Sequence, residues 1–366
     1  MANRFANMEI ENILHHDTFT REELVYMLTC SGLEEEKLFS YSGSIRNKTI
    51  GNHVHMRGLI EFSNICIKDC LYCGIRKSNK AAQRYSLTDE DILSAAEFAY
   101  KYKYGSVVLQ GGERKDKEFI QRIDRLVREI KRLSNNSLGI TLSVGEQTED
   151  TYLQWKEAGA HRYLQRIESS NQSLYTKIHP QNDLHDFKTR LECIKSLQRC
   201  GYQTGTGVMI GLPWQTIEDL ADDLLFLKDI NIDMVGMGPY LEHHETPLWE
   251  YRNLLQSQND RLKLGLHMVS CLRIMMPDIN IAATTALQAI HPAGREKALE
   301  IGANVIMPNV TPLCNRANYQ LYENKPGMDE GAEESTRRLV ESVHKSGCEI
   351  EFTAWGDSEH FFKRME

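Results

Sequence analysis

The chain has 366 residues, 41% of them hydrophobic and 26% charged, with a formal net charge of −8, which is an ordinary globular composition. This acidic balance argues against non-specific binding to nucleic acid and against association with an anionic membrane. No apolar run has bilayer-spanning length and the first residues lack the apolar core of a secretion signal, so we expect a cytoplasmic protein. In a reducing compartment the nine cysteines are more often metal ligands or catalytic groups than disulfides.

The N-terminal part of the chain is predicted to be helical. Residues 6–47 have the pattern of short helices, and Thr18 or Thr20 can cap a helix that begins near Arg21. We expect this helical extension, residues 1–50, to pack beside the main fold.

From residue 54 onward, apolar runs of strand length alternate with amphipathic helical segments. The helical pattern is clearest at 117–133, where the apolar residues fall on one face with a period of 3.6. Another helix begins at Thr88, with Asp91 at the position where a capping box places an acidic group. The eight strand-like runs are 54–62, 106–111, 139–145, 162–168, 204–212, 234–241, 280–287 and 304–309.

Eight alternating strand–helix units predict an α/β fold, a (β/α)8 TIM-type barrel. An open doubly wound sheet is the structural alternative, and the even spacing of the units favours the barrel. No Gly/Ser-rich linker interrupts the chain. We therefore expect one barrel over residues 51–322, followed over residues 323–366 by a C-terminal loop and a helix (335–346) that close it.

Three cysteines, Cys66, Cys70 and Cys73, lie within eight residues directly after the first predicted strand. Structural zinc sites usually combine two pairs of ligands, and no second pair occurs in this sequence. A redox Cys-x-x-Cys pair would use Cys70 and Cys73 but leaves Cys66 unexplained. An iron–sulfur cluster accounts for all three thiolates, and three ligands leave one iron of a cubane open for chemistry. Because catalytic groups of such barrels follow the strands, we expect the cysteines at the catalytic rim.

This spacing, with Tyr72 just before the last cysteine, resembles the radical S-adenosylmethionine (SAM) superfamily. The resemblance implies a [4Fe–4S] cluster on the three thiolates, with SAM bound to the remaining iron through its amino and carboxylate groups. It also implies reductive cleavage of SAM to methionine and a 5′-deoxyadenosyl radical. A closed barrel would keep such a radical away from water and beside its target.

Further segments resemble the SAM-binding motifs of that superfamily. Gly111, Gly112 and Glu113 look like its GGE motif, which binds the SAM amino group, although the same residues also suit a turn and a helix cap. The remaining matches are Glu168, similar to the acidic residue that bonds the SAM ribose or amine, Arg166 and Arg190, similar to basic residues that engage its carboxylate, and residues 207–213 around Met209, similar to the strand that packs on the adenine.

Over roughly residues 50–320 the chain resembles the HydE group of [FeFe]-hydrogenase maturases, which is related to biotin synthase and methylornithine synthase. Many members carry a second cluster on a C-terminal trio of cysteines. The matching stretch here, residues 319–335, has no cysteine and Cys314 is solitary, so we expect one cluster only. The resemblance also implies an electron donor such as ferredoxin or flavodoxin, and other hydrogenase maturases as partners.

HydE-like enzymes act on a small cysteine-bound iron precursor of the hydrogenase active site, carrying carbonyl and cyanide ligands, and the resemblance implies such a substrate. The predicted barrel interior suits a small anionic or zwitterionic molecule, because arginine binds carboxylates bidentately and hydroxyls and amides add hydrogen bonds. The candidates are Arg57, Gln110, Thr141, Thr284, Thr285, Asn309 and Tyr319. Thr284 and Thr285 fall in the seventh predicted strand, where only one of two neighbours can face the interior.

Two other functions remain open. A radical SAM mutase or synthase acting on a small amino acid, like methylornithine synthase, would share the barrel and the cluster. A non-enzymatic iron–sulfur carrier would need neither the GGE motif nor Glu168.

One pair of histidines, His243 and His244, follows the sixth predicted strand. Neutral imidazole is a common metal ligand, so a metal site is one interpretation. The sequence places no further ligand beside the pair, and we therefore expect two solvated loop residues.

Overall fold

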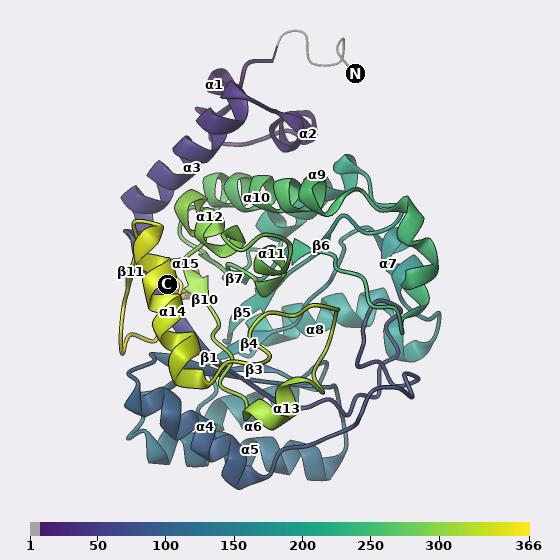
Figure 1. The fold of residues 1–366 in the computed structure, drawn as a ribbon, viewed down its shortest axis with the longest axis vertical. Coiled ribbons are helices and arrows are strands. Elements are labelled where there is room, and N and C mark those ends of the chain that lie inside the picture. The colour runs from purple at the N-terminus through teal and green to yellow at the C-terminus, as the bar shows by residue number, and fades with distance from the viewer. Residues whose placement is uncertain (1–7) are drawn as a thin grey trace.

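A ring of parallel strands surrounded by helices forms the centre of the computed structural model, which describes residues 8–366 (Figure 1). Within that range the hydrogen-bonded order is β10-β1-β2-β3-β4-β5-β7-β9, and a bridge between Ala282 and Val305 joins the two ends. The predicted (β/α)8 barrel is thus confirmed. Its strands are β1 (His53–Ser63), β2 (Ser106–Gly111), β3 (Gly139–Ser143), β4 (Arg162–Leu164), β5 (Gln203–Thr206), β7 (Met234–Val235), β9 (Asn280–Ile281) and β10 (Val305–Ile306).

Several strands are shorter than their apolar runs. The fifth and sixth predicted runs each divide in two, because β5 and β7 continue into β6 (Met209–Ile210) and β8 (Gly238–Pro239), which form a ladder of their own. The seventh run ends early, and Thr284 precedes helix α11 (Thr285–Ile290). The placement of Thr284 and Thr285 in a strand is therefore wrong, since an apolar run by itself does not distinguish a strand from a buried helix.

Helices cover the outside of the barrel. Thr20 caps α2 as expected and forms a capping box with Glu23, and the expected capping box of Thr88 and Asp91 is present at the start of α4. The helices are α1 (Ile10–Ile13), α2 (Arg21–Thr29), α3 (Leu33–Ile50), α4 (Asp89–Lys101), α5 (Lys117–Leu133), α6 (Glu149–Ala158), α7 (Gln172–Ile178), α8 (Phe187–Arg199), α9 (Ile217–Asp229), α10 (Gln258–Met275), α11, α12 (Gly294–Ile301), α13 (Leu313–Arg316), α14 (Ala332–Lys345) and α15 (Glu359–Met365), with short 3₁₀ turns η1 (Asp183–His185) and η2 (Pro247–Leu254).

The N-terminal helices lie outside the ring, where α2 packs on α9 and α3 on α10 (Figure 1). Residues 1–7, where the predicted extension begins, are outside the described part. The helix predicted at 335–346 is α14, which begins three residues earlier. No helix within residues 8–366 is long and apolar enough to cross a membrane.

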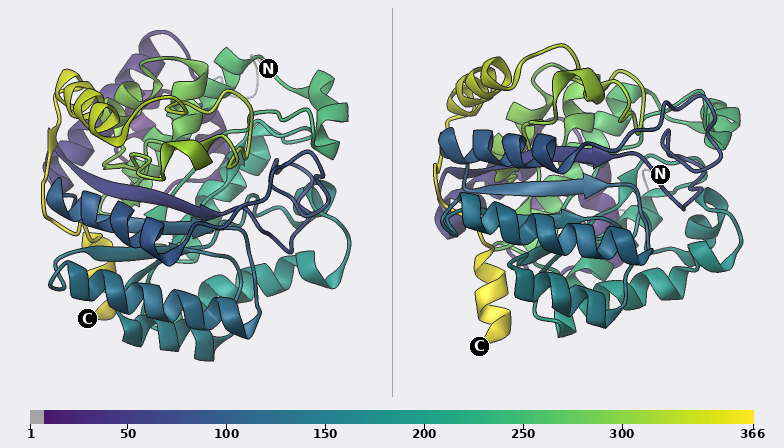
Figure 2. Two further views of the ribbon diagram at one scale, coloured as in Figure 1. Left: turned by 60° about the horizontal axis from the view of Figure 1, so that its bottom comes forward. Right: turned by 90° about the horizontal axis from the view of Figure 1, so that it is seen from below.

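The two ends of the barrel are built differently. Figure 2 shows the loop after β1 at one end and the C-terminal helix α15 at the other. Near α15, β11 (Glu349–Ile350) pairs with the start of β1. Residues 351–358 then cross the floor of the barrel, where Gly356 O accepts a hydrogen bond from Arg57 at 3.0 Å and Asp357 forms an ion pair with the fully buried Arg162. The opposite end carries the cysteine loop.

Candidate active site

The loop that follows β1, residues 64–86, carries Cys66, Cys70 and Cys73 at the C-terminal end of the strands. All three thiols are half-buried and none is in a disulfide. The guanidinium of Arg84 donates hydrogen bonds to five backbone carbonyls of this cluster loop and so fixes its path.

The thiols fit an iron–sulfur cluster. Burial raises the pKa of all three, that of Cys70 to about 12. At neutral pH these thiols would therefore become thiolates only with a cation beside them. A bound metal ion supplies that charge, because it deprotonates the thiols that coordinate it. Cys66 Sγ also accepts a hydrogen bond from the backbone N–H of Glu113 at 3.3 Å. Three thiols and no fourth cysteine in the loop match a cubane with one open iron.

Gly111 and Gly112 allow close packing around the end of β2. A Cβ on Gly112 would lie 2.4 Å from Ile65 O and 2.9 Å from the Cβ of Cys66, and a Cβ on Gly111 would lie 2.8 Å from the ring of Phe62. Real side chains do not fit at such distances. Gly112 therefore has a packing role under the cysteines, and Gly111 has one against Phe62, in addition to any contact with SAM.

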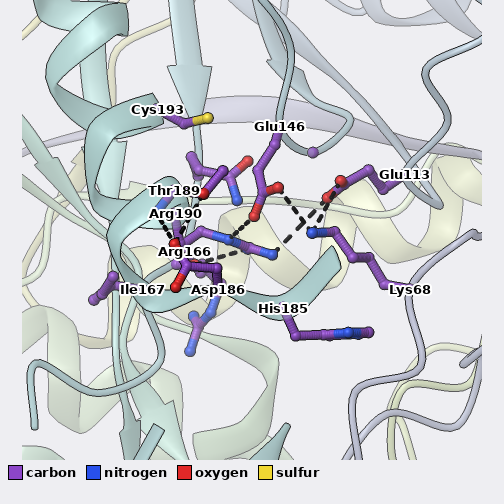
Figure 3. Close-up of polar contacts among 12 residues, drawn as sticks. Lys68, Glu113, Glu146, Arg166, Ile167, His185, Asp186, Thr189, Arg190 and Cys193 are labelled. Atoms are coloured by element: carbon purple, nitrogen blue, oxygen red, sulfur yellow. Dashed lines mark hydrogen bonds and ion pairs between the residues drawn. The ribbon is translucent and has the colours of Figure 1, made fainter. Parts of the chain in front are cut away.

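Glu113 and Arg190 belong to a buried network of four charges that reaches the cluster loop through Lys68 (Figure 3). Lys68 Nζ lies 2.8 Å from Glu146 and 3.3 Å from Glu113, while Arg190 lies 2.6 Å from Glu146 and 3.9 Å from Glu113. Burial raises the pKa of Glu113. Burial also acts on Glu146, but Arg190 and Lys68 outweigh it and lower the pKa of Glu146 to about 2.

Gly145 allows Glu113 to pack directly against the backbone beside Glu146. Its φ is +86°, and a Cβ there would lie 2.2 Å from Cγ of Glu113, so only glycine fits. Glu146 was given no role in the sequence analysis. Its position directly after Gly145 at the end of a predicted strand could have marked it as a site residue, because strand ends meet at one rim.

Glu168 is held in an uncommon backbone conformation, with φ at +67°. Its N–H donates to Gly207 O and its carbonyl accepts from Met209 N–H, both at 3.0 Å, so hydrogen bonds on either side maintain the strain. The carboxylate forms a bidentate ion pair with Arg166 at 2.8 and 2.9 Å. Strained residues concentrate at active sites, where the surrounding structure holds them in place.

A cavity of about 250 Å³ extends from the cluster loop into the barrel. The predicted site residues that line it are Tyr72, Cys73, Gln110, Arg166, Glu168, Met209, Thr284 and Thr285. Both threonines reach it because Thr284 precedes a helix, so the expectation that only one of them faces the interior is wrong. Tyr319 and Asn309 do not line the cavity themselves but contact residues that do. Tyr319 OH accepts a hydrogen bond from Gln110 at 3.4 Å, and the side-chain amide of Asn309 donates one to Glu61 at 2.9 Å.

Arg57 and Thr141 lie apart from the other candidates, at the barrel floor around a smaller cavity of about 20 Å³. Arg57 donates to Gly356 O and Met234 Sδ, and Thr141 Oγ1 accepts from Arg162 at 3.0 Å. Arg57 pairs with the first residue of β2 and Thr141 with the first residue of β4, so both lie towards the N-terminal end of the barrel, which carries stabilising rather than catalytic groups. The structure does not bring them to the main cavity.

The cavity also has charged walls that sequence reasoning missed. Lys325 pairs with Glu61, and both side chains are almost fully buried. Arg295 is buried too, and its Nε has no hydrogen-bond partner among residues 8–366. Glu61, an acid inside an apolar strand, could have been found from the sequence. Lys325 lies in residues 317–331, which we call the closing segment because they cover the cavity. No local sequence pattern identifies Lys325 as a cavity residue.

The expectation of two solvated histidines is wrong for His243, which is buried, whereas His244 is exposed as expected. The carboxylate of Glu323, from the closing segment, contacts His244. The sequence could not show this third group because 79 residues separate His244 from Glu323.

Comparison with known proteins agrees with the site. The Radical SAM superfamily profile matches residues 60–227. The chain is 46% identical to the [FeFe] hydrogenase maturase subunit HydE of Thermotoga maritima, over 87% of this chain and 88% of that one. It is 28% identical to 3-methylornithine synthase of Methanosarcina acetivorans, over 84% and 85%. A crystal structure of methylornithine synthase shares the fold, with a TM-score of 0.78 at 24% identity over 94% of this chain and 97% of that one. The chain therefore belongs to the HydE family of radical SAM enzymes, which implies a [4Fe–4S] cluster and SAM as cofactors.

Proposed function

We propose that this enzyme uses SAM at a single [4Fe–4S] cluster to act on a small cysteine-derived iron precursor of the [FeFe]-hydrogenase active site, bearing carbonyl and cyanide ligands. The 46% identity to a HydE maturase subunit supports this substrate class over a free amino acid. When bound, the cluster and SAM supply an electron and a 5′-deoxyadenosyl radical.

The observation that carries the proposal is one cavity lined both by the cluster loop and by a buried arginine without a counter-charge among the described residues. Tyr72 and Cys73 line it from the cluster loop, and Arg295 and Lys325 supply positive charge to the same cavity. Lys325 is paired with Glu61, whereas no ion pair of Arg295 occurs within residues 8–366. Burying a guanidinium without a counter-charge costs free energy, so an anionic or zwitterionic substrate that supplied the missing negative charge would bind favourably.

The other cavity residues have roles consistent with this substrate. Arg166 and Glu168, locked together, offer a fixed pair for the ribose and carboxylate of SAM, and the network of Glu113 and Arg190 lies beside the thiols. Thr284, Thr285 and Gln110 supply hydroxyl and amide groups for the substrate. Tyr322 OH donates to Thr285 at 2.9 Å, which brings the closing segment over the cavity and excludes water.

The lack of further clustered cysteines supports a single cluster. Residues 319–335 contain no cysteine, and Cys314 is exposed and hydrogen-bonded to its neighbour Asn315. We propose that every turnover starts at Cys66, Cys70 and Cys73, with reduced ferredoxin or flavodoxin as electron donor.

The test measures 5′-deoxyadenosine formed by anaerobically reconstituted enzyme with SAM and reductant, with and without a cysteine-bound iron dicarbonyl cyanide complex. We expect the iron complex to accelerate formation, and the reaction products to activate apo-hydrogenase in the presence of the other maturases. Acceleration by a common amino acid instead would identify a mutase. Cluster transfer to an apo-protein without any 5′-deoxyadenosine would identify a carrier.

Arg295 provides a sharper test of the substrate site. Arg295→Gln should raise the KM for the iron complex by roughly tenfold or more, because a hydrogen bond to a charged group contributes about 1.5–3 kcal/mol. Cleavage of SAM without substrate should not change. The matched control is Arg338→Gln, whose arginine is largely exposed on α14. Equal KM values for the two variants would contradict the assignment.

A further inference from the structure

Three potential metal ligands meet at the barrel mouth outside the SAM and substrate site. One ligand atom from each of His243, His244 and Glu323 lies within 4.8 Å of the other two. The imidazole rings of His243 and His244 are stacked, with centroids 5.3 Å apart. Two histidines come from the loop between β8 and η2, and the carboxylate comes from the closing segment.

The backbone holds these groups together without any ion. Glu323 N–H donates to Glu242 O at 3.2 Å, and His244 N–H donates to the Glu323 carboxylate at 2.9 Å. The Nε2 edge of His243 packs against Gly74, where a Cβ would lie 2.7 Å from Nε2, and His243 Nδ1 accepts a hydrogen bond from Glu245 N–H at 3.2 Å, which a metal ion on Nδ1 would replace. Gly74 follows the last cluster cysteine, and its N–H donates to Leu321 O at 3.0 Å. The three ligands are thus preorganised where the cluster loop, the β8–η2 loop and the closing segment meet.

The donor set suits a borderline divalent ion. Two imidazoles and a carboxylate are ligands of zinc and of neighbouring first-row metals, which lie roughly 2.0–2.2 Å from such donors. Donor atoms around one such ion are therefore about 3–3.5 Å apart. The His244 side chain is 59% exposed, so its ring has room to move towards that spacing. The same exposure leaves room for water to complete the coordination.

We propose that His243, His244 and Glu323 bind a divalent transition-metal ion that fastens the closing segment to the barrel mouth. Glu323 is two residues from Lys325, which lines the substrate cavity beside Tyr322. An ion at this place would therefore stabilise the closed arrangement of the segment over the cavity. It would be distinct from the iron of the cluster, whose ligands are the three cysteines.

The binding test is calorimetric titration of Zn²⁺ into the anaerobic, cluster-loaded enzyme, in which the cluster thiols are occupied. We expect one zinc site that is weakened by more than roughly tenfold in both His244→Ala and Glu323→Gln, as loss of a ligand exceeds the loss of a supporting hydrogen bond. Glutamine keeps the acceptor for the His244 N–H, so Glu323→Gln leaves the loop intact. His16→Ala is the control, because His16 and Glu23 form a surface pair at 2.8 Å whose histidine is similarly exposed.

The second measurement is hydrogen exchange of residues 317–331 with and without Zn²⁺. Protection by zinc in the parent enzyme and in His16→Ala, and its loss in Glu323→Gln, supports the proposal. The proposal is overturned if no zinc binds at millimolar concentration, if the two site variants bind zinc like the parent, or if bound zinc leaves the exchange of this segment unchanged.

Discussion

Replacing Glu146 with glutamine removes the charge at the centre of the network beside the cluster loop. The side chains of Glu146, Lys68 and Arg190 are at most 9% exposed, so water does not compensate the loss. A fall in the carboxyl pKa from 4.5 to about 2 corresponds to about 3 kcal/mol of stabilisation at neutral pH. This agrees with the roughly 3–5 kcal/mol lost when one partner of a buried ion pair is removed.

The lowered pKa of Glu146 also predicts how the free energy of unfolding depends on pH. Because the folded-state pKa of Glu146 is lowered, its stabilisation is present in full above the unfolded value near 4.5 and is lost as the pH falls towards 2. The difference between parent and variant should therefore be constant around neutral pH and shrink in acid.

Denaturant unfolding followed by circular dichroism, at equal cluster occupancy, checks both expectations. The matched control is Glu149→Gln, which removes a carboxylate paired with Arg199 at the exposed surface. We expect this control to unfold like the parent, since exposed ion pairs add little. If Glu146→Gln unfolds at the same denaturant concentration as Glu149→Gln, the network does not stabilise the fold as we argue.

Three further changes test the cluster loop and the core. Cys73→Ser should abolish both cluster iron and 5′-deoxyadenosine formation, while Cys314→Ser, which alters an exposed thiol, should retain both in iron and activity assays. Gly112→Ala should lower iron content by displacing the cluster loop, whereas Gly331→Ala, with nothing within 4 Å of the added Cβ, should not. Burial raises the pKa of Asp223 to about 7, so the free energy of unfolding should fall as pH rises from about 4 to 7, and Asp223→Asn should remove that slope in denaturation midpoints.

Features that depend on nearby residues were predictable. The cysteine spacing, the glycine pair and the amphipathic pattern of α5 are local, and each predicted its element or its loop correctly. Glu168 and Arg166 were predicted from the resemblance to SAM-binding motifs, and both line the cavity at the rim where strand ends meet.

Features that depend on distant contacts were not predictable. Arg57 was expected in the substrate site because it lies on the first strand, yet residues near the C-terminus cover it at the floor. Lys325 and Glu323 reach the barrel mouth from a polar loop without periodicity. Thr284 and Thr285 were placed in the seventh predicted strand because the apolar run there continues past Ile281. The run does not show that the strand itself ends at Ile281.

The pairing of β1 has a consequence for synthesis of the protein. One side of β1 pairs with β2, which follows soon after in the chain, but the other side pairs with β10 and β11 near its end. The strand that leads into the three cysteines thus keeps an open edge on the ribosome until residues 305–350 have emerged. Such distant pairings form slowly, and an unpaired edge invites association with other chains. The cysteines are enclosed only after these late strands have paired, so we expect a cluster to enter the closed barrel after translation.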